Sequence, residues 1–325
     1  ILDTAVERNL RMQRLTESLL VGPTAADAAI RLEAIGREAI PFLKAGLKAD
    51  NLEARFYAAE ALAYLGDTSG VKVLREAAAQ EPAFRVYALT ALAATQSPDA
   101  VVELQQLFHH DSVETRYGAF RAVRQIAPSD PSVGALSMQA PYACHIVGST
   151  APPVVHLTLR RKAELVIFGG EQRLKSPVVL RAGRNILVRS QPTGDRLIVS
   201  YIASGEREQR REISMRLADL IVTVDEFGAD YPAVVQMLVE ADRQGNLAGA
   251  LSFDELPRGG RIYVRPQANG STEPGEEAHV GGQAGQPNLF DASDHSQGAI
   301  ESPVDPDDAA KGPSSGLDSV GFTVD

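Results

Sequence analysis

The side chains of this sequence with the greatest capacity for metal binding or nucleophilic chemistry are six histidines and a single cysteine. His109 and His110 are adjacent at the end of an expected helix, where neighbouring side chains point about 100° apart, so one metal ion does not readily bind both. A favourable interaction with the C-terminal end of that helix is the simpler expectation. Cys144 and His145 adjoin on an expected strand and should face opposite sides, which argues against a nucleophile pair. A pair of Cys144 with His156 across a hairpin stays geometrically open.

The glycine patterns that hold phosphates and the His-Glu-x-x-His pattern that holds zinc are absent. Gly169-Gly170 and Gly259-Gly260 both lie outside a phosphate-binding motif. One cysteine also excludes an internal disulfide framework and any metal site built from several cysteines. The sequence therefore predicts no catalytic, cofactor-binding or metal-ligating residue, no cofactor, and a protein that is not an enzyme.

A group of basic residues lies in the part of the chain where we expect strands. These side chains could bind an anionic polymer or a partner, and they could also protect the edges of a sheet from unwanted pairing. The group consists of Arg160, Arg161, Lys162, Arg181, Arg184, Arg189 and Arg196. Both interpretations remain open at this point.

The net charge of the chain is concentrated at one end. The 325 residues carry a net charge of -10, and residues 266–325, with eleven acidic residues and one lysine, account for all of it. The neutral remainder argues against broad nucleic-acid binding, which needs clustered positive charge. No apolar run approaches the roughly 20 residues of a membrane-spanning helix, so no membrane insertion is expected.

An internal repeat organises the first part of the chain. Arginines at 55, 85 and 116 begin similar segments 30 and 31 residues apart, and an earlier unit aligns Leu32 with Leu62. Each period fits two short helices, of which the second is expected at about 38–48, 70–80 and 99–109. One such pair cannot bury its apolar face alone, so neighbouring pairs should stack. Leu32, Leu62, Leu92 and Val123 are expected in one core layer.

This pattern resembles short HEAT repeats over about residues 24–127. The resemblance implies a structural ladder of aspartate and arginine side chains between repeats, with ligand contact by the arginines as the alternative. The ladder residues are Asp50, Arg55, Arg85, Asp111 and Arg116.

Three tyrosines follow the repeat arginines closely along the chain. Tyr57, Tyr87 and Tyr117 are expected to pack in the core or in a groove, and a candidate interaction surface is the alternative for them.

Four regions follow from these patterns. Residues 1–23 form an N-terminal helix or cap, and 24–130 hold the helical repeats. Residues 131–265 form an α+β module, in which closely spaced β-branched runs predict antiparallel hairpins before helices at about 213–227 and 231–243. The acidic segment 266–325, rich in Gly, Pro and Ser, is expected to be disordered. The predicted fold class is an α-solenoid of short HEAT-like repeats, followed by a small α+β module and a disordered tail.

One segment near the end of the α+β module carries a second resemblance. Residues 228–238, Gly245 and residues 247–251 look like the C-terminal end of flagellar basal-body P-ring proteins, and the whole chain is similar to a variant of that family with HEAT-like repeats. The chain departs from the family in its acidic tail, and no signal peptide or N-terminal ring-forming part is found in it.

The P-ring resemblance implies a non-enzymatic structural protein that forms or supports a ring around the flagellar rod. The implied location is the periplasm. The implied partners are further copies of the chain or other components of the flagellar basal body.

Two other hypotheses stay open. The first is a general HEAT-repeat scaffold that binds a peptide or protein. The second is a lyase-type HEAT enzyme with a chromophore or another small-molecule substrate, which only Cys144 and the paired histidines favour.

Overall fold

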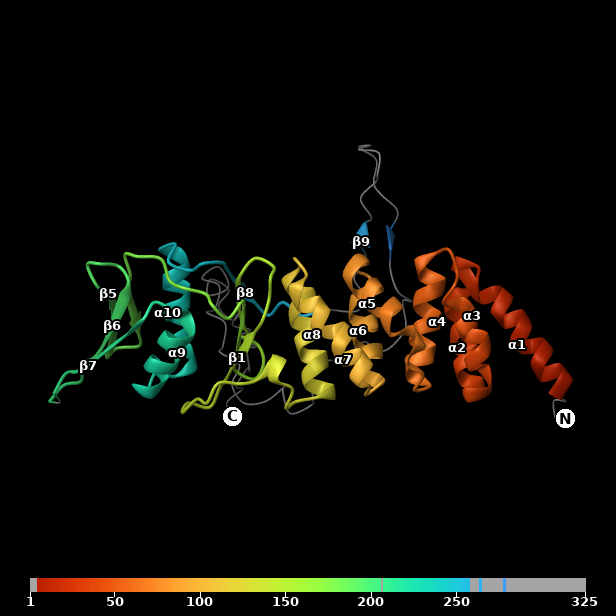
Figure 1. The fold of residues 1–325 in the computed structure, drawn as a ribbon, viewed down its shortest axis with the longest axis horizontal. Coiled ribbons are helices and arrows are strands. Elements are labelled where there is room, and N and C mark those ends of the chain that lie inside the picture. Colours follow the sequence, from red (N-terminus) through yellow and green to blue (C-terminus); the bar gives the residue numbers. More distant parts are fainter. Residues whose placement is uncertain (1–4, 206, 258–262, 265–276, 279–325) are drawn as a thin grey trace, which may run out of the picture.

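A row of helices leads into a region with two sheets in this computed structural model, which describes residues 5–205, 207–257, 263–264 and 277–278 (Figure 1). The helices of the row alternate with single 3-10 turns and short loops. They are α1 (Ala5–Leu19), α2 (Gly22–Ile35), α3 (Ile40–Gly46), α4 (Leu52–Tyr64), α5 (Val71–Gln80), α6 (Arg85–Ala94), α7 (Pro98–Gln106) and α8 (Val113–Ile126). The coarse fold prediction, helical repeats followed by a sheet-containing region, is therefore confirmed.

Local signals fix where the helices begin and end. The Asn51 side chain accepts a hydrogen bond from the Ala54 amide at 2.7 Å, and Ser112 caps α8 in the same way. Gly36 and Gly66, one period apart, have φ values of +88° and +78°. Only glycine adopts this backbone conformation without strain, so both positions end a first helix and turn the chain towards the second.

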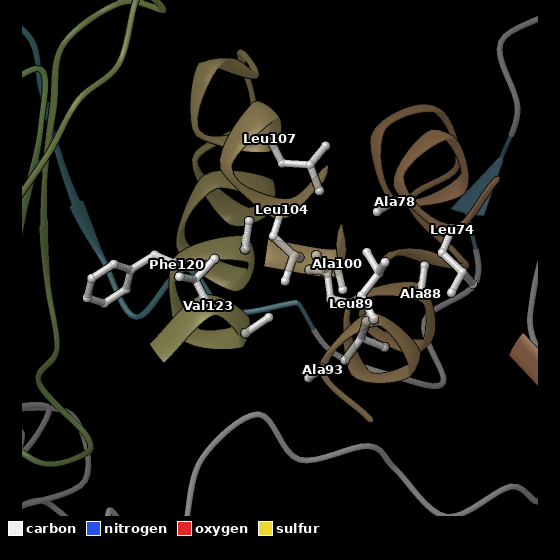
Figure 2. Packing of buried hydrophobic residues seen from close by; sticks show 14 of the residues in the cluster. Leu74, Ala78, Ala88, Leu89, Ala93, Ala100, Leu104, Leu107, Phe120 and Val123 are labelled. Atoms are coloured by element: carbon white, nitrogen blue, oxygen red, sulfur yellow. The ribbon is translucent and has the colours of Figure 1, made fainter. Parts of the chain in front are cut away.

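The first helices of successive repeats pack side by side, α2 on α4, α4 on α6 and α6 on α8. Leu32, Leu62, Leu92 and Val123 are all fully buried, but they divide between two hydrophobic clusters, Leu32 and Leu62 in the first and Leu92 and Val123 in the next. Figure 2 shows how small and branched side chains from α5, α6, α7 and α8 fill the space between the helices. Alanines allow this close approach, because each adds only a methyl group to the interface.

The first sheet has the strand order β1-β3-β2-β8. Its strands are β1 (Ala143–Val147), β2 (Val154–Leu157), β3 (Glu164–Phe168) and β8 (Ala250–Phe253). The β2–β3 pair is antiparallel, whereas β1–β3 and β2–β8 are parallel. The expectation of antiparallel hairpins is thus confirmed for β2 and β3 and wrong for the other two pairs, because β8 joins the sheet from a distant part of the chain.

The second sheet is an antiparallel meander in the order β4-β5-β6-β7, as the hairpin prediction requires. It comprises β4 (Val179–Ala182), β5 (Ile186–Ser190), β6 (Arg196–Tyr201) and β7 (Gln209–Ser214), and α9 (Leu217–Glu226) and α10 (Tyr231–Arg243) follow. The helix predicted to begin at residue 213 begins instead at Leu217, because residues 209–214 form a strand of the sheet. β9 (Tyr263–Val264) and β10 (Glu277–Ala278) pair with each other. The rest of the acidic tail and its predicted disorder lie outside the described residues.

The first sheet separates two hydrophobic cores. Val154, Val166 and Phe168 pack with the helical repeats, whereas Val155 and Leu165 pack with α9, α10 and the second sheet. Strand residues alternate between the two sides, so a sheet with both faces covered needs apolar residues at nearly every position. No helix within the described residues has the length and apolar character needed to span a bilayer.

Candidate functional site

Two predicted ladder arginines bind main-chain oxygens of the aspartates that precede them. Arg55 donates to the carbonyl oxygens of Ala49 and Asp50 at 3.0 and 2.8 Å. Arg116 donates to the carbonyl oxygen of Asp111 at 3.3 Å. These contacts tie the start of a first helix to the loop before it. These contacts are to main-chain oxygens, so ion pairs between the aspartate carboxylates and these arginines remain a prediction.

Arg85 makes the clearest contact between consecutive repeats. Its guanidinium binds the carboxylate of Glu114 at 2.7 Å, and both side chains are largely buried. Arg75 and Glu103 form a second such pair at 2.8 Å. Both pairs join residues 28 or 29 positions apart, close to one period, so a search for acids one period away would have found them.

The three tyrosines do not form a surface together. Tyr87 and Tyr117 expose only 5% and 1% of their area and belong to the core, while Tyr57 is half-buried between Phe56 and Phe84. For Tyr87 and Tyr117 the interaction-surface alternative is therefore wrong, because both side chains are buried, and the Tyr117 ring stacks on His156 of the first sheet.

Tyr117 instead takes part in a charged site at the junction between α8 and the first sheet. Residues 117, 121 and 124 share one face of α8, as their helical spacing requires. The Tyr117 hydroxyl donates to Glu164 Oε2 at 2.8 Å, and Arg121 and Arg124 donate to Oε1 of the same carboxylate. Glu164 begins β3 and is 4% exposed, so its charge is held in the interior by donors from α8.

A cavity of about 40 Å³ adjoins this carboxylate, and we call it the junction cavity. Besides Tyr117, Ala143 and Ala163, the residues that line it are Arg121, Arg124, Arg161, Lys162 and Glu164. Four cationic side chains thus surround one anionic side chain. Arg161 and Lys162 come from the turn between β2 and β3, and they belong to the basic group that the sequence singled out without assigning it a role.

His145 lies behind the junction cavity. Its Nδ1 is 2.9 Å from the Val133 carbonyl oxygen, which makes it the protonated nitrogen, and its Nε2 lies 3.8 Å from Glu164 Oε1. Burial lowers the pKa of His145, since the interior disfavours the imidazolium form, although Glu164 opposes this shift. His145 is therefore neutral near pH 7 and adds no positive charge to the cavity.

Cys144 and His156 are separated by the sheet itself. Cys144 on β1 packs with the α9–α10 core, whereas the His156 ring on β2 stacks on Tyr117 at 3.8 Å, on the opposite side. Strand β3 lies between their strands. Burial raises the pKa of the Cys144 thiol to about 12, so the thiolate is not populated near neutral pH. The Cys144–His156 pair is thus excluded.

His109 and His110 each bind a main-chain amide instead of sharing a ligand. His109 Nδ1 accepts from Thr150 at 3.0 Å, and His110 Nδ1 accepts from Ser112 at 3.0 Å. Within the described part of the chain, no group of three or more His, Cys, Asp or Glu side chains is placed to hold a metal ion.

A second cavity of about 380 Å³ lies between the β4–β5 turn and the connection from α9 to α10. Tyr201 and Phe227, whose rings are 6.2 Å apart, line it together with Arg184, Asn185 and Asp230. Its lining mixes aromatic, amide and oppositely charged groups.

Comparison with known proteins finds a HEAT-like repeat in one part of the helical row. A family model of the PBS lyase HEAT-like repeat matches residues 54–80, which include most of α4 and all of α5. Among solved structures, human deoxyhypusine hydroxylase in complex with glycerol is similar, with a TM-score of 0.31 and 20% identity over 40% of this chain. The similar part spans 51% of that chain, about half its length. No curated protein matches the sequence.

These comparisons correct the P-ring interpretation and its flagellar function. The family match is to a PBS lyase HEAT-like repeat. The local backbone of this fold explains two glycines of the segment that resembles P-ring proteins. Gly228 ends α9 with a φ of +86°, and Gly249 lies against the main chain of Pro153. Glycines that end a helix or allow two main chains to approach closely occur in many unrelated folds.

The prediction that the chain is not an enzyme is corrected as well. The similar solved structure is by its name a hydroxylase.

Proposed function

We propose that this chain is a HEAT-repeat scaffold that binds another protein through its helical repeats, which stack as a short solenoid. Stacked helical repeats provide extended binding surfaces, because each pair of helices adds the same strip of surface to its neighbour. The HEAT-like match at residues 54–80 supports this function.

The observation that carries the proposal is an exposed surface on two neighbouring first helices, which we call the α2–α4 face. It consists of Ile30, Glu33, Tyr57, Glu60 and Tyr64. Ile30 and Tyr64 expose 66% and 45% of their area, which is much for large apolar side chains on adjacent helices. Glu60 acts electrostatically on both tyrosines, and Glu33 acts on Glu60 and on Tyr64, so these four side chains are close together. Ile30 lies on the same helix as Glu33, three residues before it.

The chemistry of this face favours a partner with both apolar and basic groups. Large apolar side chains of the partner would cover Ile30 and Tyr64, and a lysine or arginine would neutralise Glu33 and Glu60 and lie near the tyrosine rings. A periplasmic location, which fractionation of the native cells would test, stays a separate prediction.

Affinity capture from native cells tests the proposal. We expect the double variant Ile30→Ser with Tyr64→Ser to recover at least about tenfold less of the partner than the wild type, since central apolar contacts dominate protein interfaces. The matched control is Val102→Ser, which removes an exposed apolar side chain from α7. Equal loss in the control variant, or full capture by the double variant, would contradict the proposal.

A pH effect on stability is expected from the same face. Burial, reinforced by Glu33, raises the pKa of Glu60 from its ordinary value of 4.5 to about 7. The folded protein therefore holds this proton more tightly than the unfolded chain does. The resulting stability is fully present below about pH 4.5 and is lost as the pH rises through about 7.

The variant Glu60→Gln should consequently be more stable than the wild type at pH 8, by about 1 kcal/mol, and nearly unchanged at pH 4.5. Thermal unfolding followed by circular dichroism at both pH values measures this difference. Glu17→Gln, on the exposed side of α1, is the control and should show no such pH dependence. A pH-independent effect of Glu60→Gln would refute the assignment of the titrating group.

A further inference from the structure

We propose that the second cavity, between the β4–β5 turn and the connection from α9 to α10, binds an α-amino acid with an aromatic side chain. We call it the aromatic cavity. This inference goes beyond the scaffold function and does not depend on it, because no residue of the α2–α4 face lines this cavity. The two places lie near opposite ends of the described structure (Figure 1).

The aromatic cavity has room for a small molecule because short side chains line much of it. Its volume of about 380 Å³ lies within the range of roughly 300–1,000 Å³ that is usual for small-molecule sites. A Cβ atom at Gly228 would meet no atom within 4 Å, so the space beside this residue is open. The buried part of the lining, its floor, is apolar and consists of Ala182, Ile186, Ala229 and Ala233. An apolar group of a ligand is therefore favoured at the floor, where it leaves water.

Two aromatic rings line the cavity above this floor. Tyr201 and Phe227 are both half-buried, and their ring planes are inclined at 42° to each other. The Arg211 guanidinium lies over the Phe227 ring, 5.1 Å from its centroid, and is itself paired with Glu226. These contacts hold the Phe227 ring in place before a ligand arrives, which lowers the entropic cost of binding. A flat aromatic group can pack against such rings, and this contact adds to the gain from burial alone.

Two exposed side chains of opposite charge complete the lining. Arg184 belongs to the β4–β5 turn and Asp230 directly precedes α10. Within the part of the chain that the structure describes, neither of them forms an ion pair, with the other or with a third residue. Asp230 Oδ1 accepts a hydrogen bond from the Ala233 amide, which leaves Oδ2 for a ligand. Both charges are thus open to a partner.

This pair of charges selects a zwitterion. A ligand with only a carboxylate would be attracted by Arg184 and repelled by Asp230, and a ligand with only an ammonium group would show the reverse. An α-amino acid carries both groups on one carbon atom and is neutral overall, as the two rim charges together are. Its side chain extends from the same carbon atom and can reach the apolar floor. Because Tyr201 and Phe227 line the cavity, an aromatic side chain is the best match.

L-Tryptophan is a suitable probe, because the chain itself contains no tryptophan. The fluorescence anisotropy of the amino acid therefore reports its binding to the full 325-residue chain at neutral pH. We expect a Kd below about 1 mM, which is ordinary for a ligand of this size. Tryptamine lacks the carboxylate and indole-3-propionate lacks the ammonium group, so each should bind at least about fivefold more weakly than L-tryptophan.

Two variants locate the charges that the ligand contacts. Arg184→Gln should weaken the binding of L-tryptophan and indole-3-propionate about fivefold and should not weaken that of tryptamine. Asp230→Asn should weaken L-tryptophan and tryptamine by a similar factor and should not weaken indole-3-propionate. Asparagine caps a helix as well as aspartate does, so this variant keeps the start of α10. Arg189→Gln is the matched control and should bind like the wild type, because this exposed arginine of β5 does not line the cavity.

A Kd of L-tryptophan above about 1 mM would overturn the proposal, and so would equal affinity for the three probes. Equal weakening of all three probes in both charge variants would overturn it as well, since the charges would then not act on the matching groups of the ligand. Partner capture is measured separately on the α2–α4 face, so the scaffold function and this site can fail independently.

Discussion

Replacing Glu164 with glutamine is expected to lower the free energy of unfolding by about 3 kcal/mol, because it removes the one anion that lines the junction cavity. Arg121 is 10% exposed, and its guanidinium would lose the Glu164 carboxylate in a largely water-excluded place. The Tyr117 hydroxyl would exchange an ionised acceptor for an amide, which makes a weaker hydrogen bond.

Thermal unfolding measures this effect, and a decrease of the Tm by about 6–12 °C corresponds to it for a protein of this size. Asp27→Asn is the matched control. It breaks the ion pair between Asp27 and Arg31 on α2. The side chains of Asp27 and Arg31 are 66% and 64% exposed. Solvent-exposed pairs of this kind contribute little, so the control should keep its Tm within about 2 °C. A similar small change in Glu164→Gln would show that Glu164 does not hold the junction together.

Gly249→Ala is expected to be the most damaging single methyl addition at a glycine of the described structure. A Cβ atom at residue 249 would lie 1.8 Å from the carbonyl oxygen of Pro153 and 2.4 Å from its carbonyl carbon. Both atoms belong to the main chain just before β2, so no side-chain rotation relieves the clash. The same oxygen accepts a hydrogen bond from the Ala250 amide at 3.2 Å, which begins the pairing of β8 with β2.

We therefore expect Gly249→Ala to lose about 3 kcal/mol or more of stability, or to accumulate as insoluble protein. Gly148→Ala is the control, because a Cβ atom there meets no atom within 4 Å. The yield of soluble protein and the Tm of both variants provide the comparison. Normal folding of Gly249→Ala would mean that β8 does not approach β2 as closely as the structure places it.

Local sequence patterns were sufficient to predict where the helices of the repeats lie. The predicted second helix at 70–80 closely matches the 3-10 turn at 68–70 together with α5, and the helix predicted at 231–243 coincides with α10. Helices depend on contacts within a few residues and on caps such as Asn51, so their signals lie close together in the chain.

The pairing of distant strands could not be predicted in this way. Residues 250–253 are a short apolar stretch after a glycine, and nothing near them indicates a partner at 154–157. Residues 209–214, which are mostly charged or polar, form the edge strand β7, where charges discourage further pairing. In both cases the decisive interactions are non-local.

The junction cavity had a signal in the repeat alignment. Arg121 and Arg124 stand where the preceding repeat has Thr90 and Ala93, so the last repeat alone carries two arginines on this face. Such a departure indicates a different neighbour for the last repeat. That the neighbour is a strand beginning with Glu164 could be learned only from the fold.

The parallel pairing of β2 with β8 has a consequence for synthesis of the protein on the ribosome. Val154 pairs with Ala250, so the first sheet cannot be completed until almost all of the described chain has left the exit tunnel. The helical repeats rely on contacts between nearby residues and can form much earlier. For that interval, the apolar surface of α8 that later packs on the sheet is open to solvent. The nascent chain is therefore most prone to aggregation after its repeats have folded and before its last long strand is made.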